Sequence, residues 1–211
     1  MSKRIFTSLL MFLVVGLGAI SNANAQACDD ATITASLNEG CIPTTITFTV
    51  DNEPNYTTAT WYWNDSSGNT TAYTRDFESF TFNFWGTFTP YVVYFDGNGD
   101  PICTLEVDRP VRIFDNPNVD FQLPPGDTQC FEDNLFCFTD RTTPGRDNAP
   151  IRSRLWAFGN GDSSTQEDPC YQYPQDGVYD IELIAVDTNG CRDIEVKTTS
   201  IVVLPVNYPA L

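Results

Sequence analysis

The clearest pattern in this sequence is an alternation of apolar and polar positions over short stretches. In one such stretch the apolar face consists of Tyr179, Ile181, Leu183 and Ala185. The residues between them include Asp180 and Glu182, so this segment has the period of two that is typical of a half-buried β-strand. Runs rich in β-branched and aromatic residues recur at 45–50, 88–95 and 135–139. This pattern predicts an all-β chain.

The pattern occurs twice along the chain. Gly86 and Gly99 enclose an aromatic strand segment and Gly177 and Gly190 enclose its counterpart, and in both copies the two glycines are 13 residues apart. An Asn-Gly pair ends each segment, which predicts a two-residue hairpin turn with positive φ at both central residues. Each copy spans about 90 residues with about seven short strands, the size of a β-sandwich domain.

The two copies define the expected domain organisation. We expect a signal peptide at 1–25, a first β-sandwich at 26–115, a second at 116–205 and a tail at 206–211. The segment 115–118 contains a proline between two asparagines, residues that interrupt strands, and it is therefore the expected linker.

The N-terminal segment 1–25 has the features of an export signal. Lys3 and Arg4 precede an apolar run at 9–20, and the small residues Ala23 and Ala25 come just before the expected cleavage site. An uncleaved anchor is the alternative, but the run is short for a membrane span. A lipoprotein modified at Cys28 is disfavoured because no aliphatic residue precedes it in the usual place. We expect a secreted or cell-surface protein, with no membrane insertion after cleavage, in a compartment where disulfides persist.

Seven cysteines predict a set of disulfides. The stretch of chain between Cys41 and Cys103 is almost equal in length to that between Cys130 and Cys191. This near-equal spacing predicts an equivalent bridge within each unit.

The other three cysteines do not follow the repeat. Cys137 lies on a β run and Cys170 lies in an Asp-Pro-Cys turn, and we expect a third bridge between them. Cys28 is then left over, either as a free thiol or as a link to another chain.

The second unit carries a more specific motif. Residues 155–164 have the sequence LWAFGNGDSS, residues 168–173 DPCYQY and residues 176–181 DGVYDI. This resembles the polycystic kidney disease (PKD) repeat, whose pattern runs W-x-F-G-D-G, then N-P-x-H-x-Y, then G-x-Y-x-V. The sequence departs from that pattern at Asn160, where the family usually has Asp, and at Tyr171, where His is common. The first unit matches weakly, because WYWND replaces the glycine turn.

The resemblance implies an all-β fold class with two tandem immunoglobulin-like β-sandwich domains after the signal peptide. It implies surface or secreted proteins that use the domain for adhesion, spacing or substrate contact. The acidic, cysteine-bearing style is similar to PKD modules in surface proteins of Bacteroidota-like bacteria. Within the motif we expect Trp156 to pack on the Cys130–Cys191 bridge and Tyr173 to cap a corner of the sandwich.

Aromatic residues of the first unit form a candidate ligand surface. Trp61, Tyr62 and Trp63 are consecutive, so at least one of them points away from the core if they form a strand. Trp61, Tyr62 and Trp85 are the candidates for stacking on a sugar ring or for contact with a protein partner. The competing expectation is that the neighbouring unit covers them.

Acidic residues form two candidate cation sites. Asp96, Asn98 and Asp100 have the D-x-N-x-D spacing that begins a calcium loop. No closing glutamate follows, and the counterpart at 187–190 has no third carboxylate, so a polar hairpin turn explains both segments as well. The second acidic group consists of Asp162, Glu167 and Asp168. Weakly bound calcium is the only cofactor considered.

The amino-acid composition excludes several classes of catalytic site and binding partner. The chain has no histidine, which excludes a Ser-His-Asp triad, H-E-x-x-H zinc sites and a histidine-activated thiol. Its net charge of −17 has the wrong sign for binding nucleic acid or an anionic membrane. Paired carboxylates are the remaining acid/base chemistry, but with 28 acidic residues such pairs are not specific. We therefore expect a protein without enzymatic activity.

Two functions remain. The first is adhesion or extracellular structural assembly through contacts with other surface or extracellular proteins. The second is an accessory module that presents exposed aromatic residues to a polysaccharide or another polymer. Tyr62 and Trp85 discriminate between them, because sugar binding loses its platform if both side chains are buried.

Overall fold

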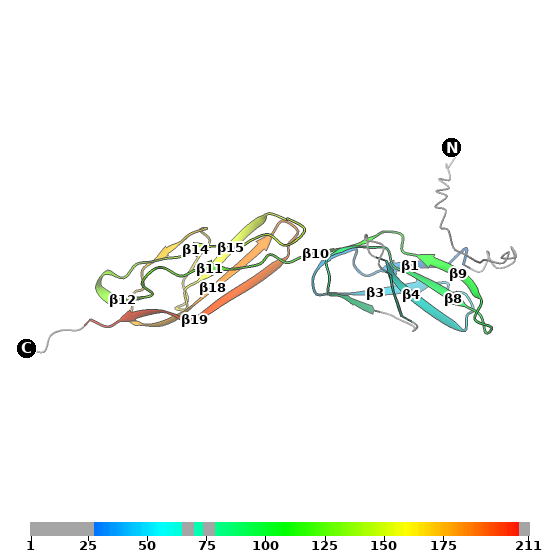
Figure 1. Cartoon of the computed structure of the whole chain (residues 1–211), viewed down its shortest axis with the longest axis horizontal. Helices are drawn as coiled ribbons and strands as arrows, with labels where there is room; N and C mark the ends of the chain where they lie inside the picture. The colour runs from blue at the N-terminus through cyan, green and yellow to red at the C-terminus, as the bar shows by residue number, and fades with distance from the viewer. Residues whose placement is uncertain (1–27, 65–69, 74–78, 207–211) are drawn as a thin grey trace, which may run out of the picture.

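The computed structural model describes residues 28–64, 70–73 and 79–206, and it contains two β-sandwich units placed end to end (Figure 1). Strands β1–β10 form the first unit and β11–β19 the second. The chain is therefore all-β with two tandem immunoglobulin-like sandwiches, as the sequence predicts. The expected signal peptide at 1–25 and most of the tail at 206–211 lie outside the described residues.

Three sheets make up the first unit. Their strand orders are β1-β3-β6, β2-β10-β7 and β5-β4-β8-β9. The strands are β1 (Thr32–Ala35), β2 (Glu39–Cys41), β3 (Thr44–Asp51), β4 (Thr58–Asn64), β5 (Thr70–Tyr73), β6 (Ser79–Phe82), β7 (Gly86–Phe88), β8 (Tyr91–Phe95), β9 (Pro101–Glu106) and β10 (Val111–Phe114).

Side chains that alternate between the two faces of β4 place two tryptophans in the core of this unit. Trp61 and Trp63 are buried, and Tyr62 lies on the opposite face of the strand. Phe48 of β3 packs against both tryptophans, with ring centroids 5.8 and 5.2 Å away. β6 ends at Phe82, which is buried, whereas Phe84 lies beyond the strand and is 76% exposed.

The second unit is built on one large sheet with the order β12-β19-β18-β15-β16, together with the pairs β11-β14 and β13-β17. Its elements are β11 (Phe121–Gln122), β12 (Thr128–Cys130), the 3-10 helix η1 (Phe131–Asp133), β13 (Phe136–Cys137), β14 (Thr139–Asp140), β15 (Ile151–Ala157), β16 (Ser163–Ser164), β17 (Cys170–Tyr171), β18 (Gly177–Asp187) and β19 (Arg192–Leu204). The apolar face expected for β18 is buried at Ile181, Leu183 and Ala185.

Trp156 is at the centre of the second core. Its ring lies 5.1 Å from that of Phe121 and 5.6 Å from that of Phe138, and its indole Nε1 donates to the carbonyl of Gln166 at 3.0 Å. The expectation that Trp156 packs on a Cys130–Cys191 bridge is wrong, because these two cysteines are not bonded to each other.

Tyr173, which follows β17, forms a hydrogen bond in the same core to Phe158, which follows β15. It is buried and donates its hydroxyl to the carbonyl of Phe158 at 2.9 Å. Burial, with smaller contributions from Tyr171 and Tyr179, raises the pKa of Tyr173. The hydroxyl therefore stays protonated as a donor across the physiological pH range.

The two Asn-Gly hairpins have the same hydrogen bonds. The amide of Gly99 donates to the carbonyl of Asp96 at 3.1 Å, and that of Gly190 to Asp187 at 3.2 Å. Only the glycines have positive φ, 86° and 88°, so the expected two-residue turn is wrong. Each connection is a longer loop in which glycine alone takes the left-handed conformation.

The disulfides differ from those that the repeat predicts. The three bonded pairs are Cys28–Cys103, Cys41–Cys191 and Cys137–Cys170, and the unpaired, exposed cysteine is Cys130. The expected bridges Cys41–Cys103 and Cys130–Cys191 are wrong for this structure. The expected leftover thiol, Cys28, is bonded. The third expected pair, Cys137–Cys170, is bonded as predicted.

The geometry of β19 explains why Cys130 cannot reach Cys191. Cys130 pairs in register with Leu204 at the end of β19, whereas Cys191 precedes Arg192 at its start. A strand of 13 residues separates its ends by roughly 40 Å at about 3.3 Å per residue. A disulfide spans less than about 7 Å between Cα atoms. Equal spacing along the chain therefore does not give equal positions in the fold.

In the oxidised, folded protein, we expect maleimide to modify Cys130 alone, because the other six cysteines are bonded. Intact mass after labelling should increase by one adduct, and peptide mapping should place it on Cys130. The variant Cys130→Ser should gain none. An adduct on Cys28 would instead support the pairing predicted from the repeat.

Candidate functional site

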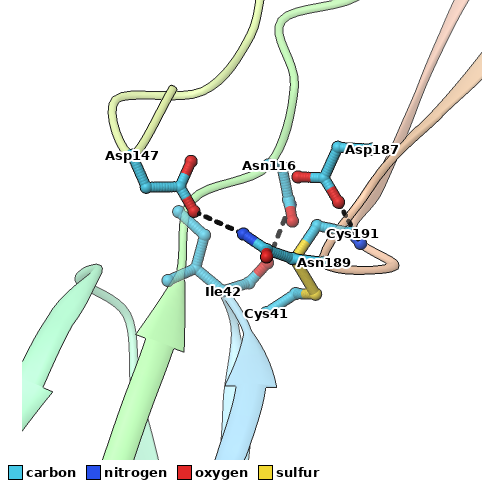
Figure 2. Close-up of a disulfide and its surroundings, with 7 residues drawn as sticks. All are labelled: Cys41, Ile42, Asn116, Asp147, Asp187, Asn189 and Cys191. Atoms are coloured by element: carbon cyan, nitrogen blue, oxygen red, sulfur yellow. Dashed lines mark hydrogen bonds between the residues drawn. A yellow bond between two sulfur atoms is a disulfide. The ribbon is translucent and has the colours of Figure 1, made fainter. Parts of the chain in front are cut away.

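A disulfide crosses the junction between the two units. Cys41 ends β2 opposite Phe114, the last residue of β10, and Cys191 lies in the turn between β18 and β19. Their Cα atoms are 5.5 Å apart, although the residues are separated by 150 positions in sequence (Figure 2). The bond therefore joins the end of one sandwich to the nearest turn of the other.

The linker is also held by both units. The side-chain amide of Asn116 donates to the carbonyl of Ile42 at 2.8 Å (Figure 2), and the carboxylate of Asp115 accepts from the amide of Arg146 at 3.0 Å. A Cβ at Gly145 would lie 2.6 Å from the carbonyl oxygen of Asn116, so only glycine allows this approach. Covalent and polar contacts thus fix the short connection.

Two carboxylates lie beside the disulfide. Asp187 is fully buried, and its Oδ1 accepts from the amide of Cys191 at 2.8 Å. Asp147 Oδ2 accepts from the side-chain amide of Asn189 at 2.9 Å (Figure 2). The other oxygen of each carboxylate, Oδ2 of Asp187 and Oδ1 of Asp147, is buried without a hydrogen-bond partner within the described residues. Both atoms are enclosed by the surrounding protein, so neither is open to a ligand from the solvent.

A cleft of about 450 Å³ opens between the units. Its lining includes Trp85, Arg112 and Phe114 from the first unit and Asp147, Asn148 and Asn189 from the second. Trp85 is 42% exposed, so much of the indole is open to solvent. The volume falls within the range of about 300–1,000 Å³ that is usual for small-molecule sites.

The positive charge in this cleft is already paired. Arg112 Nη1 lies 3.6 Å from Glu39 Oε1, and its guanidinium carbon lies 5.3 Å from the ring centroid of Phe114. Arg112 is therefore engaged with a carboxylate and an aromatic face, while Asp147 contributes negative charge. The cleft combines an aromatic face with neutral polar groups, and it has no excess positive charge to attract an anion.

The three candidate aromatic residues lie in three different environments in the structure. Trp85 borders the cleft, and Trp61 is buried in the core. Tyr62 points outward and stacks on Tyr91 of the same unit, with centroids 4.7 Å apart and an interplanar angle of 8°. Neither Tyr62 nor Trp85 is fully buried, so the result that would have removed the sugar-binding surface does not occur, but the two side chains do not form one platform.

In the candidate calcium loop, the carboxylate of Asp96 accepts hydrogen bonds from the backbone of the same loop. Asp96 Oδ1 accepts from the backbone amides of Asn98 at 2.8 Å and Asp100 at 2.9 Å. These bonds, that from Asp100 first, lower the pKa of Asp96. Throughout the ranges that the structure covers, no group of three or more Asp, Glu, Cys or His side chains is placed to hold a metal ion. The arrangement favours the hairpin-turn interpretation.

The second acidic group is likewise engaged within its own unit. Asp168 accepts from the amide of Asp140 at 2.8 Å, and Glu167 lies 3.8 Å from Arg154. Asp162 accepts from the hydroxyl of Tyr171.

The two departures from the PKD motif contact each other. The side-chain amide of Asn160 donates to the hydroxyl of Tyr171 at 2.8 Å, and the ring of Tyr171 stacks on Phe158 at 4.2 Å. Burial and the hydrogen bond to Asp162 raise the pKa of Tyr171. We therefore assign these residues to the local structure of the glycine turn.

Sequence reasoning did not identify most of the cleft. Asn189 was recognised only as a turn residue, and nothing pointed to Arg112, Phe114, Asp147 or Asn148. These residues come from three segments of the chain that meet only when the two units are joined. A proline- and glycine-containing loop at 144–150 was the one available signal, since such loops often carry binding residues.

Comparison with known proteins relates the second unit to PKD domains. Residues 126–203 match the PKD domain family. A microbial collagenase of Vibrio alginolyticus is 44% identical over 43 residues, which is 20% of this chain and 5% of the collagenase. The chain thus matches only a small part of that relative.

Solved structures show similar folds. The PKD1 domain of the Vibrio cholerae metalloprotease PrtV is 28% identical, with 41% of this chain and 98% of that one covered and a TM-score of 0.35. The fibronectin(III)-like modules of Clostridium thermocellum CbhA are 12% identical, with 85% and 99% covered and a TM-score of 0.38. Across the residues that the structure describes, no helix is long and apolar enough to span a membrane.

Proposed function

We propose that this chain is a secreted or cell-surface, non-catalytic protein that acts in adhesion or extracellular structural assembly through contacts with other extracellular proteins. In this proposal residues 1–25 are removed on export, 26–115 form a divergent PKD-like unit and 116–205 form a PKD unit.

The observation that carries the proposal is the Cys41–Cys191 disulfide. Relative motion is the usual behaviour of two domains joined by a short linker. Here a covalent bond crosses the junction and Asn116 adds a hydrogen bond to Ile42. A fixed end-to-end pair of sandwiches suits a spacer or assembly subunit, which must hold its binding surfaces at a set separation. Three disulfides also suit an oxidising extracellular compartment, and the absence of histidine supports a role without catalysis.

A second candidate function is an accessory carbohydrate-binding module. The cleft favours it, because Trp85 presents an exposed indole beside polar side chains of the other unit. Both functions place the protein outside the cell, and they differ in whether the recognised partner is a protein or a polysaccharide.

The proposed function is tested by deleting the gene in the source organism. We expect the protein in the extracellular or cell-surface fraction of the wild type, and reduced surface attachment or loss of an extracellular assembly in the deletion strain. Complementation with the wild-type gene should restore both. Unchanged attachment and assembly, or a protein found only in the cytoplasm with the segment 1–25 retained, would overturn the proposal.

Rigidity of the junction is a separate prediction. In the oxidised protein, residual dipolar couplings from both units should fit one alignment tensor. In the double variant Cys41→Ser/Cys191→Ser the two units should need different tensors, because the covalent link across the junction is gone. The matched control Cys137→Ser/Cys170→Ser removes a disulfide within the second unit and should keep the common tensor. A common tensor in both double variants would show that the linker alone fixes the orientation.

A further inference from the structure

We infer that the outer face of the large sheet in the second unit binds a second copy of this chain, in a symmetric contact centred on Ile184. This inference names a partner for the proposed assembly function and rests on that function. The face is formed by β15, β18 and β19, which lie side by side along the second unit (Figure 1). It is the side of the sheet that faces away from the buried ring of Trp156.

This outer face is apolar, whereas the solvent side of an antiparallel sheet usually carries polar side chains. Leu155, Ile184 and Ile194 pair directly across the three strands and form a central row. Leu155 is 42% exposed, Ile194 is 43% exposed, and Ile184 between them is half-buried. Val186 lies in the row on one side and Val196, 46% exposed, in the row on the other. Single exposed apolar residues are common, but a contiguous patch of five marks an interaction surface.

Two opposite charges lie at opposite ends of this patch. Arg192 pairs in register with Val186, and Glu182 pairs with Val196 on the far side of the central row. Val186 and Glu182 are four residues apart on β18, about 13 Å, which is too far for Arg192 and Glu182 of one chain to form an ion pair. Neither residue forms an ion pair with any other part of the chain that the structure describes.

The positions of these charges select one way of pairing two copies. Sheets that pack face to face keep their strands aligned within about 30°. If the two-fold axis runs along β18, Glu182 of each copy faces Glu182 of the other, and the like charges repel. If the axis runs across the strands through the central row, the three apolar residues of that row face their own counterparts. Arg192 of each copy then lies over Val196 of the other, one strand spacing of about 4.8 Å from Glu182.

A second copy therefore fits this face better than an unrelated partner does. The complete chain has a net charge of −17, so most of its surface repels another copy. On this face the charges of Arg192 and Glu182 cancel, and an arginine side chain spans one strand spacing. A symmetric contact forms both ion pairs at once around an apolar centre, because symmetry supplies the matching charges at the required separation.

The size of the face sets the expected affinity. Three strands about 4.8 Å apart and the seven residues of β15 at about 3.3 Å each give an area of about 14 by 23 Å. This is at the small end of specific interfaces, so we expect a dimer with a Kd of roughly 10–100 µM. In this dimer the first units extend in opposite directions, because the axis reverses the ends of the two sheets.

The test is sedimentation equilibrium of the secreted, oxidised protein at about 5–500 µM, a range that brackets the expected Kd. A Cys130→Ser background prevents a disulfide between chains. We expect a monomer–dimer equilibrium. Ile194→Asp should weaken the dimer at least about tenfold, because it places two carboxylates against each other at the apolar centre. The matched control Leu37→Asp makes the same kind of change at a side chain that is 51% exposed in the first unit, and it should leave the affinity unchanged.

Charge reversal tests the reciprocal ion pairs separately. Arg192→Glu and Glu182→Arg should each weaken the dimer about tenfold, and the double variant should regain the wild-type affinity. Glu182→Arg makes the chain less acidic, so general repulsion alone would strengthen the dimer and not weaken it. Rescue in the double variant has no explanation within one chain, because the two side chains are about 13 Å apart along the sheet.

Three results would overturn the inference: a monomer throughout the concentration range, a dimer of unchanged affinity in Ile194→Asp, or no rescue in the double charge reversal. If Ile194→Asp does not fold, the charge reversals still decide, since Arg192 is exposed. Sedimentation uses the purified protein, whereas surface attachment is scored in the deletion strain. A protein that stays monomeric can therefore still show the attachment phenotype, and the two proposals fail separately.

Discussion

Replacing Trp156 with alanine is expected to lower the free energy of unfolding of the second unit by about 3–5 kcal/mol, the loss seen when a large aromatic side chain is removed from a core. Trp156 is fully buried between Phe121 and Phe138, and its indole also donates to Gln166 at 3.0 Å. The variant therefore buries less apolar surface, contains a cavity, and leaves the carbonyl of Gln166 without its hydrogen-bond donor. Urea unfolding followed through the NMR signals of each unit measures the loss.

The same experiment carries its own controls. Signals of the first unit, such as that of Val92, should keep their unfolding midpoint, because Val92 belongs to a separate core. Trp85→Ala removes an equally large but partly exposed side chain and should change stability far less. A loss below about 1 kcal/mol in Trp156→Ala, the scale of ordinary surface changes, would contradict the central position assigned to this residue.

Gly159→Ala is the second change with a large expected effect. Gly159 has φ of +77°, and a Cβ there would lie 2.6 Å from the carbonyl oxygen of Asp180 on β18. A left-handed conformation costs about 1–2 kcal/mol for a residue other than glycine, and forcing the loop off β18 adds about 1–3 kcal/mol, as overpacking does. We expect the free energy of unfolding of the second unit, measured in urea, to fall by the sum of these two costs.

Gly161 in the same turn separates the two causes. It has φ of +98°, but a Cβ there would meet nothing within 4 Å, so Gly161→Ala should show only the conformational part of the loss. Equal losses at both positions would mean that the approach of Asp180 has no energetic role. A smaller loss at Gly159 than at Gly161 would contradict the turn geometry itself.

Residues of the candidate site show how far the sequence could lead. Trp85 was identified as one of the aromatic residues that are dense in the sequence of the first unit, which is a local property. Asp147 and Asn148 lie in an irregular loop whose neighbours depend on where the linker directs the second unit. Because the cleft combines segments from both units, the local sequence pattern could identify a residue of the wall formed by the first unit but none of the wall formed by the second.

The sequence by itself determined the all-β class, the core face of β18 and two consecutive sandwich units. The core face follows from the period of two along a strand, and the two units follow from the repeat of the pattern, so both are properties that can be read along the chain. Only the tertiary structure decided the disulfides and the cleft. Cys130 and Cys191 occupy opposite ends of β19, while Cys41 reaches Cys191 across the junction. Which strand ends meet depends on how the sheets and the two units are placed in space, and spacing along the chain does not carry that information.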